Sequence, residues 1–273
     1  MTKLSACSLG LAILLLAGCS TTPDESEGES ALEAEPDITA LVDRAEAEPE
    51  DPTLQYQLGN ALFDLRRYPE ARTAYANAVA LDADFADAHT NLGLTYRLLS
   101  DLPNALNHYR MSLALQPNDI TTLQNIIIVL RLQGAYEAAA RYAGRLAELS
   151  PQDAAAQSDL AALFYELGRY DEAASQYGRA IAIVPGDVSA RYQQGSAYYQ
   201  LEAWERAIAA WAALLQRDPD HGDAHLGMAM AHWRQKDFNA AWEAVSECQR
   251  VGVPIPPSFF SRLQADSGRL GPR

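Results

Sequence analysis

The chain has 273 residues, and its 36 aspartates and glutamates outnumber its 21 lysines and arginines, which gives a formal net charge of −15 at pH 7. Such a charge repels phosphate backbones and anionic lipid headgroups, so nucleic-acid binding is not expected. Alanine is abundant while glycine and β-branched residues are sparse, which predicts an all-α protein. Cys7, Cys19 and Cys248 are too far apart in sequence to predict a zinc knuckle or a disulfide framework.

The N-terminus has the features of a secretory signal. Lys3 precedes an apolar run over residues 9–16 that is too short to span a bilayer, and small residues follow it. The sequence Leu-Ala-Gly-Cys at residues 16–19 resembles the lipobox of bacterial lipoproteins, in which the cysteine is diacylated and becomes the new N-terminus. The resemblance implies that residues 1–18 are a signal peptide and that Cys19 carries a lipid anchor.

Residues 19–50 are predicted to form an acidic tether behind that anchor. Small polar residues and carboxylates predominate and Arg44 is the only basic residue, so we expect residues 20 to about 36 to stay unfolded. A helical spacing of apolar residues then predicts a short helix over residues 37–48. In enteric Gram-negative bacteria an aspartate after the lipidated cysteine signals retention in the inner membrane. Ser20 therefore indicates the outer membrane, with the protein facing the periplasm and attached to it through the lipid alone.

From Pro52 onward the chain repeats itself every 34 residues. An alanine column recurs at this spacing: Ala71, Ala105, Ala139, Ala173, Ala207 and Ala241. A large residue precedes each alanine by three positions: Tyr68, Leu102, Tyr136, Tyr170, Trp204 and Phe238. A proline follows the middle four alanines by twelve positions. Small residues allow two helices to approach closely and proline ends a helix, so the period predicts helix–turn–helix units that stack into a solenoid.

The pattern resembles the tetratricopeptide repeat over residues 52–253, as six units. The units begin at Pro52, Ala86, Ile120, Ala154, Val188 and Gly222. The resemblance implies a right-handed α-solenoid, closed by a capping helix within residues 254–273. Irregular packing is expected in unit three, where Ile127 replaces a small residue, and in unit six, which carries His232, Val245 and Val253 at consensus positions.

The sequence holds no motif of an active site, whether a phosphate-binding glycine loop, HExxH or GxSxG, so neither catalysis nor a cofactor is expected. Three histidines near Asp223 invite a metal site: His221, His225 and His232. However, His225 and His89 both occupy position 4 of their units, where this repeat places a packing aromatic. We interpret them as core residues rather than metal ligands, and Cys248 as a small buried thiol.

A helical projection places positions 2, 5, 6, 9, 12 and 13 of each first helix on the arc that faces the concave groove in this family. Position 6 carries a row of amides and one carboxylate: Gln57, Asn91, Asn125, Asp159 and Gln193. Amides both donate and accept, so such a row can bind the backbone of an extended peptide. It resembles the asparagine ladder of O-linked N-acetylglucosamine transferases. An asparagine at this position is also common in the repeat whatever it binds, and both interpretations stay open.

Arginines and aromatic residues, which often anchor interfaces, lie beside the row at positions 5 and 12. They are Tyr56, Phe63, Arg97, Arg131, Tyr165, Tyr192, Tyr199 and Trp233. The sequence thus predicts an envelope scaffold or assembly factor that binds a segment of a partner protein in its groove. Pilus assembly, outer-membrane protein insertion and peptidoglycan enzymes all remain open as its pathway. The alternative is an accessory of a cell-wall or glycosyl-transfer enzyme that binds peptidoglycan or saccharide, with the aromatic row as its stacking platform.

Overall fold

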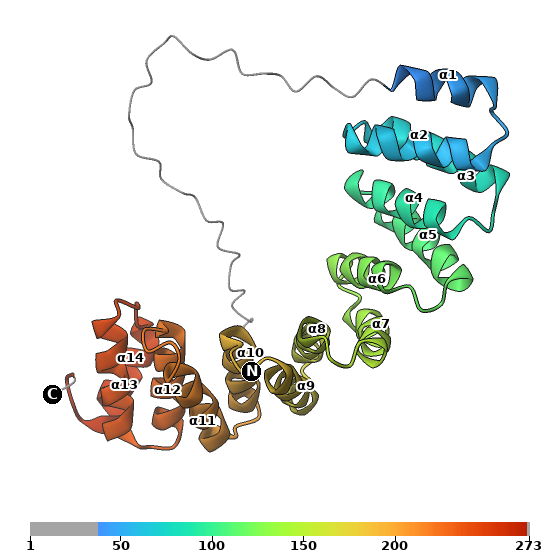
Figure 1. Ribbon diagram of the computed structural model, residues 1–273. Helices are drawn as coiled ribbons and strands as arrows, with labels where there is room; N and C mark the ends of the chain where they lie inside the picture. Colours follow the sequence, from blue (N-terminus) through green and yellow to red (C-terminus); the bar gives the residue numbers. More distant parts are fainter. Residues whose placement is uncertain (1–37, 272–273) are drawn as a thin grey trace, which may run out of the picture. The chain divides into compact units, whose positions relative to one another are not determined.

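The computed structural model describes residues 38–271. The chain divides into two units, Met1–Pro36 and Asp37–Arg273, and the described helices belong to the second (Figure 1). Residues 38–271 form α-helices, turns and loops without a strand, which confirms the all-α prediction. The predicted signal peptide, Cys19 and most of the acidic tether lie outside the described residues.

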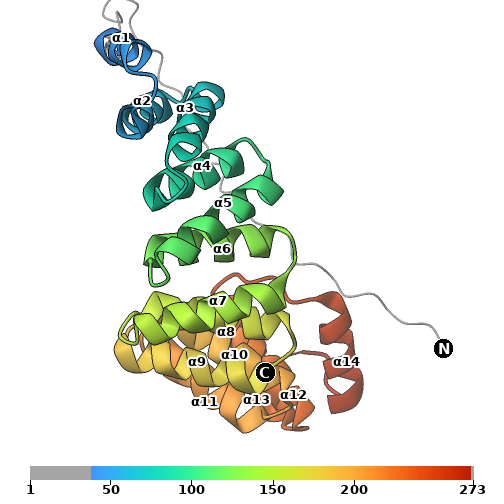
Figure 2. The same ribbon diagram turned by 90° about the vertical axis from the view of Figure 1, so that its right-hand side faces the viewer.

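Six helix–turn–helix units follow one another along the chain (Figures 1 and 2). Their first helices are α2 (Pro52–Asp64), α4 (Ala86–Leu98), α6 (Ile120–Leu132), α8 (Ala154–Glu166), α10 (Val188–Gln200) and α12 (Gly222–Arg234). Their second helices are α3 (Tyr68–Leu81), α5 (Leu102–Leu115), α7 (Tyr136–Leu149), α9 (Tyr170–Ile183), α11 (Trp204–Leu215) and α13 (Phe238–Arg250). Each first helix begins where the sequence period begins, each second helix begins at the large residue before the alanine column, and the six-unit solenoid is confirmed.

The same tight turn joins the two helices of every unit. Position 15 has a positive φ in all six units: Arg66, Ser100, Gly134, Gly168, Glu202 and Lys236. In unit three the Gly134 N–H donates to Arg131 O at 3.0 Å and the Ala135 N–H donates to Leu130 O at 2.8 Å. This is the Schellman arrangement, which satisfies the last carbonyls of the first helix. Only two of the six turns use glycine, so the other four hold a side chain in a conformation that favours glycine.

The alanine column lies at the centre of each unit, and all six of its alanines are fully buried. In the core beside it, two facing residues of each unit are complementary in size. They stand at position 8 of the unit, on the first helix, and at position 24, on the second helix. A Cβ added to Gly59 would lie 2.5 Å from the ring of Tyr75, and one added to Gly93 would lie 2.8 Å from Tyr109. Gly195 is covered in the same way by Trp211. A large ring at position 24 is thus paired with a small residue at position 8, which is glycine in units one, two and five and Ala161 opposite Tyr177 in unit four.

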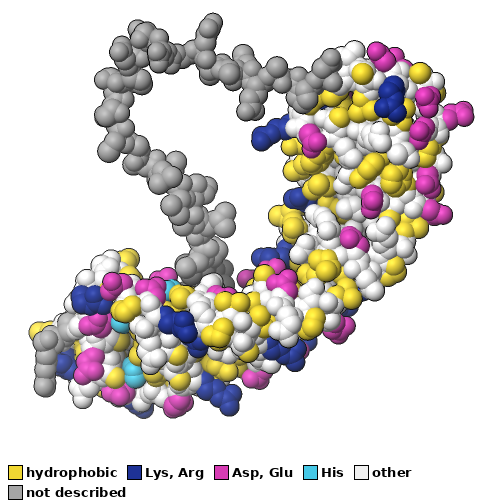
Figure 3. All heavy atoms as spheres, viewed as in Figure 1, with side chains coloured by type: hydrophobic (Ala, Val, Ile, Leu, Met, Phe, Trp, Pro, Cys, Tyr) yellow, Lys and Arg dark blue, Asp and Glu magenta, His cyan; other side chains and the backbone are white. Residues whose placement is uncertain are grey.

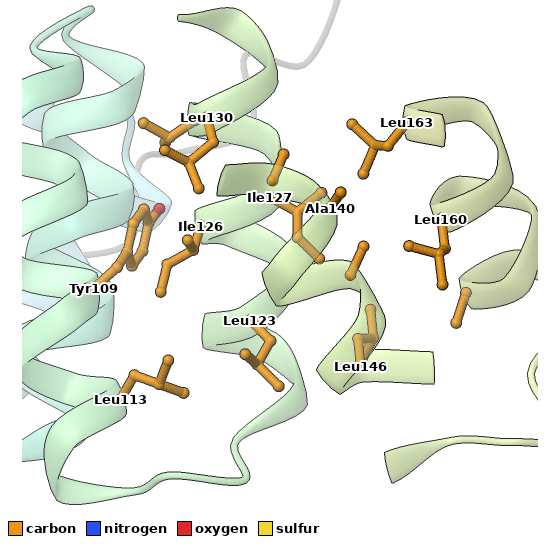
Figure 4. Packing of buried hydrophobic residues seen from close by; sticks show 14 of the residues in the cluster. Tyr109, Leu113, Leu123, Ile126, Ile127, Leu130, Ala140, Leu146, Leu160 and Leu163 are labelled. Atoms are coloured by element: carbon orange, nitrogen blue, oxygen red, sulfur yellow. The ribbon is translucent and has the colours of Figure 1, made fainter. Parts of the chain in front are cut away.

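Unit three reverses this pairing. Ile127 at position 8 is 4% exposed, and the facing position 24 holds Ala143, which is also buried. Both belong to an aliphatic cluster that runs from Tyr109 through α6 and α7 to Leu160 and Leu163 (Figure 4). The irregular packing expected at Ile127 is therefore absent, because the small and large residues exchange places and the filled volume is conserved. Unit six keeps the ordinary order, with Ala229 at position 8 and Val245 at position 24, and both are fully buried.

In five of the six first helices, the side chain at position 4 hydrogen-bonds to a carbonyl of the preceding helix or of the loop that follows that helix. The His89 Nε2 lies 3.1 Å from Ala83 O, the His225 Nε2 lies 2.9 Å from Pro219 O, and the Arg191 Nη2 donates to Pro185 O at 3.1 Å. Gln55 and Gln157 donate to carbonyls ten residues earlier. Leu123 replaces the donor in unit three with an aliphatic side chain. The histidines are thus hydrogen-bonded core residues, as the sequence indicated.

A further helix packs at each end of the stack. The predicted helix over residues 37–48 is α1 (Thr39–Ala47) and the predicted cap is α14 (Pro257–Ser267), which buries Phe259 and Leu263. Two hydrogen bonds hold the end of α14: the Trp233 Nε1 donates to Asp266 Oδ2 at 2.9 Å and the Trp242 Nε1 donates to Ser267 Oγ at 3.0 Å.

Candidate functional site

The six first helices line one side of the described stack, which we call the first-helix face, and the second helices line the other (Figure 1). The face presents positions 5, 6, 9, 12 and 13 of each unit. Every predicted groove residue lies on these helices, so the structure places all of them along one side of the solenoid. Their side chains differ in how far they remain available to a partner.

The amide row at position 6 is partly engaged within the protein. The Asn91 Nδ2 donates to Asn60 Oδ1 at 2.9 Å and to Tyr56 Oη at 3.2 Å, and the same Asn60 oxygen accepts from Tyr75 Oη at 2.7 Å. The Asn125 Nδ2 donates to Thr121 O, one turn earlier in α6, at 3.0 Å. Asn91 therefore uses both N–H donors of its amide within the protein and can offer a peptide only its oxygen, whereas Asn125 keeps one N–H donor and its oxygen.

The aromatic residues of position 12 pack against the turn that follows them. Phe63, Tyr165 and Tyr199 each make an edge-to-face pair with the residue that begins the next helix. The ring centroids are separated by 5.3, 5.2 and 4.9 Å respectively. Trp233 instead packs on Phe259 of α14 with a centroid separation of 5.8 Å. Each of these rings packs on a residue that begins the second helix of its unit or on α14. Together they therefore do not form a row of ring faces that are free to stack on a ligand.

The tyrosines of position 5 pack against the last residue of their own units. Tyr56 lies 4.8 Å from Phe85, and Tyr192 stacks on His221 at 5.2 Å, in both cases between ring centroids. Burial raises the pKa of Tyr192 above its usual value, so its hydroxyl stays protonated at neutral pH.

Within residues 38–271, no group of three or more His, Cys, Asp or Glu side chains is placed to hold a metal ion.

The two arginines of position 12 lie in adjacent units. The Arg131 Nη1 is 3.9 Å from Asp159 Oδ1, and both side chains are about half exposed. Gln57 and Asp159 are exposed and Gln193 is half-buried at position 6 of their units. An ion pair this long and this exposed contributes little to stability, so Arg131 can exchange Asp159 for a carboxylate of a partner.

The sequence interpretation missed the apolar groups on the same face. At positions 9 and 13, Leu98 and Ile128 are each 41% exposed and Leu132 is 63% exposed. Ile128 and Leu132 line a depression of about 340 Å³ between α6 and α8, whose floor includes Ala162 and Leu163. We call this depression the unit-three pocket. Yellow apolar atoms reach the surface along this part of the described stack in Figure 3.

A sequence signal for the pocket was present in α6. Residues 126–132 read Ile-Ile-Ile-Val-Leu-Arg-Leu, and no more than about half of a helix can face one core. Ile126, Ile127, Val129 and Leu130 are buried, so Ile128 and Leu132 must face outward. Projection of the apolar residues, rather than the amides alone, would have found them.

These features define an α-solenoid with an extended interaction face. Family models of tetratricopeptide repeats match residues 59–99 and 161–202, residues 29–72 and 192–247, and residues 86–119. By sequence as well as by fold, the chain is a tetratricopeptide repeat protein. A search of curated proteins gave no match. Within residues 38–271, no helix is long and apolar enough to cross a membrane.

Solved structures show the same fold at low sequence identity. YrrB, described as a tetratricopeptide repeat protein with an unusual peptide-binding site, is 23% identical, with a TM-score of 0.59 over 72% of this chain and 98% of YrrB. MamA from Desulfovibrio magneticus RS-1 is 22% identical, with a TM-score of 0.55 over 61% of this chain and 94% of MamA. PilF from Pseudomonas aeruginosa is 17% identical, with a TM-score of 0.52 over 81% of this chain and 99% of PilF.

Proposed function

We propose that this protein is a non-catalytic, lipid-anchored scaffold of the bacterial envelope, which binds a segment of a partner protein on its first-helix face. The observation that carries the binding role is the exposure of three large aliphatic side chains, Leu98, Ile128 and Leu132, in adjacent units of one face. Contiguous apolar surface of this kind marks interaction sites in soluble domains. The likeness to YrrB, whose description names a peptide-binding site, supports the same role.

The anchor and the location are proposed from the sequence. The Leu-Ala-Gly-Cys sequence at residues 16–19 supports lipidation of Cys19, and Ser20 supports the outer membrane. The acidic residues that follow would repel one another and extend the chain between the membrane and the solenoid. The protein would then hold its partner close to the membrane surface.

The aromatic residues bear on the saccharide alternative. A sugar-stacking platform needs open ring faces, whereas Phe63, Tyr165, Tyr199 and Trp233 pack against turns or against α14. The most exposed groups of the face are aliphatic and suit a protein segment better than a sugar. Protein binding is therefore the role that we propose.

In-cell photo-crosslinking tests the binding role. A crosslinking residue at Leu132 or Asn125 should capture the same partner, identified by mass spectrometry, while one at Arg141, which is exposed on the second helix of unit three, should not. Equal capture from Arg141 would contradict binding on the first-helix face. Separately, the N-terminal peptide of the mature chain should begin at an acylated Cys19, and Cys19→Ser should release the protein from the membrane fraction.

A further inference from the structure

The first-helix face changes its charge along the stack. Units two and three carry no acidic residue at positions 5, 6, 9, 12 and 13, although the chain as a whole has a net charge of −15. Their charged groups at these positions are Arg97 and Arg131. The nearest acidic residue of these two helices is Asp87, in the first turn of α4 and almost three turns from Arg97. Unit four reverses the sign with Asp159 and Glu166.

The same two units carry the exposed aliphatic side chains. Leu98, Ile128 and Leu132 are exposed, and Leu94 beside them is half-buried. The four residues occupy positions 9 and 13 of α4 and α6, so stacking of the units places them in two adjacent rows. We call these four residues, together with Arg97 and Arg131, the apolar–arginine patch. Leu132, at 63%, is more exposed than any other large apolar side chain of the six units. Replacing the water around it with apolar atoms of a partner would be favourable.

The unit-three pocket gives this patch a definite anchor point. Its volume of about 340 Å³ exceeds that of a single aliphatic or aromatic side chain, and Ile128, Leu132, Ala162 and Leu163 make it largely aliphatic. Arg131 of unit three and Glu166 of unit four also line the pocket. An apolar side chain can fill the pocket while a carboxylate beside it reaches Arg131.

The guanidinium groups of the patch have N–H donors that can bind such a carboxylate. A guanidinium has five N–H donors. Arg131 meets Asp159 only at 3.9 Å and is about half exposed, so its donors can turn to a partner, and Arg97 lies at the same position of the adjacent unit. Arginine binds carboxylates through two parallel hydrogen bonds, which fix direction as well as charge.

We propose that the apolar–arginine patch binds a protein segment in which an apolar side chain, seated in the unit-three pocket, is flanked by acidic residues that pair with Arg131 and Arg97. The acidic side of the segment lies over units two and three, because Asp159 and Glu166 would repel it over unit four. This rests on the proposed function and specifies the chemistry of the partner. A second copy of the chain is the competing occupant, and its presence on the patch would show as a dimer that Leu132→Glu dissolves.

Selection from a random peptide library tests this chemistry with the full mature chain in detergent. Dodecapeptides displayed on phage should enrich sequences with one apolar residue and acidic residues on one side of it. Leu132→Glu should weaken the selected peptides by about tenfold or more, as expected for a central anchor. The matched control is Leu149→Glu, the same change at a 37% exposed leucine of α7, which should leave affinity unchanged. Both variants should show the thermal stability of the parent.

A charge exchange makes the test specific for the arginines. Arg131→Glu should weaken the acidic peptides by about tenfold and strengthen the same peptides with lysines in place of the acidic residues. Raising the ionic strength should reduce both differences, because the exposed charges are then screened. The matched control is Arg141→Glu, the same charge change at an exposed arginine of α7, and it should change neither.

The outcomes separate this proposal from the general binding role. If the selected peptides bind Leu132→Glu as well as the parent but do not bind variants of unit five, binding on the first-helix face stands and the assignment to the apolar–arginine patch is wrong. A consensus of apolar and basic residues, or a dimer of the chain that Leu132→Glu dissolves, would also overturn it. If no peptide is enriched over a blank surface and in-cell crosslinking captures nothing from Leu132 or Asn125, the proposal and the binding role both fail.

Discussion

Units three and five solve the same packing problem with opposite residues. In unit five the ring of Trp211 covers Gly195 and also presses on Gly227 of unit six, whereas in unit three Ile127 faces Ala143. At position 4, Arg191 of unit five donates to Pro185 O in the loop after α9, whereas unit three has the aliphatic Leu123. On the first-helix face, unit five presents Tyr192 and Gln193 while unit three presents Ile128 and Leu132.

The difference shows that the repeat fixes the backbone but leaves two choices open. The first is which helix supplies the large core side chain, and the second is whether the outward positions are polar or apolar. In unit three, both the large core side chain and the outward positions are aliphatic. This unit therefore combines a continuous aliphatic core with an exposed aliphatic surface. A repeat protein can thus place a binding site by changing a few positions within one unit.

The largest expected effect comes from exchanging the core pair of unit five for that of unit three. Trp211→Ala should lower the free energy of unfolding by about 3–5 kcal/mol, because it leaves a cavity against two glycines. Adding Gly195→Ile should restore part of this loss, since it recreates the pairing of Ile127 and Ala143. Urea denaturation of the single and double variants measures it. A double variant that is as unstable as the sum of the two singles would show that the pairs are not interchangeable.

A smaller effect is expected in unit four, between the two compared units. Ala173→Leu should destabilise the protein by about 1–3 kcal/mol, because Ala173 is fully buried where the two helices of the unit approach closely. The same change at the exposed Ala114 of α5 serves as its control and should be neutral. An unchanged urea midpoint for Ala173→Leu would contradict the close approach at the alanine column.

Arg191→Leu should convert the polar tie of unit five into the apolar arrangement of unit three. We expect a loss of about 0.5–1.5 kcal/mol, the usual contribution of one hydrogen bond, here to Pro185 O. Thermal melting at several salt concentrations measures the change. Gained stability would mean that the aliphatic residue is preferred at position 4 throughout the stack.

The smallest expected effect is a pH dependence of stability that arises in unit two and not in units three and five. The Nδ1 atoms of His108 and His89 are 3.1 Å apart, and burial together with the nearby His89 lowers the pKa of His108 below its usual value. The unfolded chain therefore binds a proton more readily than the folded one, and stability should fall as the pH drops below about 6.5. His108→Gln should remove part of that dependence in melts between pH 7 and pH 5. An identical pH profile would show that another group titrates.

The period in the sequence was enough to predict the fold. Both helix starts of each unit follow from the alanine and aromatic columns, because a column that must be small or large in every unit leaves only one register. The sequence did not predict the left-handed turn residue, since Arg66 and Lys236 are poor markers of positive φ beside Gly134 and Gly168. It also did not predict the reversal at Ile127, which depends on a partner sixteen residues away.

The site was predicted less well than the fold. Helical projection placed the predicted groove residues on one side of the stack, but it could not show that Asn91 donates to Asn60 or that Asn125 donates to its own helix. Whether an aromatic ring is open or braced against a turn depends on neighbours that a projection omits, as at Tyr165 and Tyr199. The exposure of Leu132 follows from the same projection when it is applied to the apolar residues of α6, because the other apolar residues already fill the buried side.

The terminal helix α14 has a consequence for the assembly of the protein. Identical units that stack on one another would accept a further unit at any open end, so a solenoid with bare ends could polymerise into filaments. Phe259 and Leu263 fill the open side of unit six, and α14 is fastened there by hydrogen bonds from Trp233 and Trp242. The length of the array is thereby fixed by the sequence of one chain rather than by its concentration.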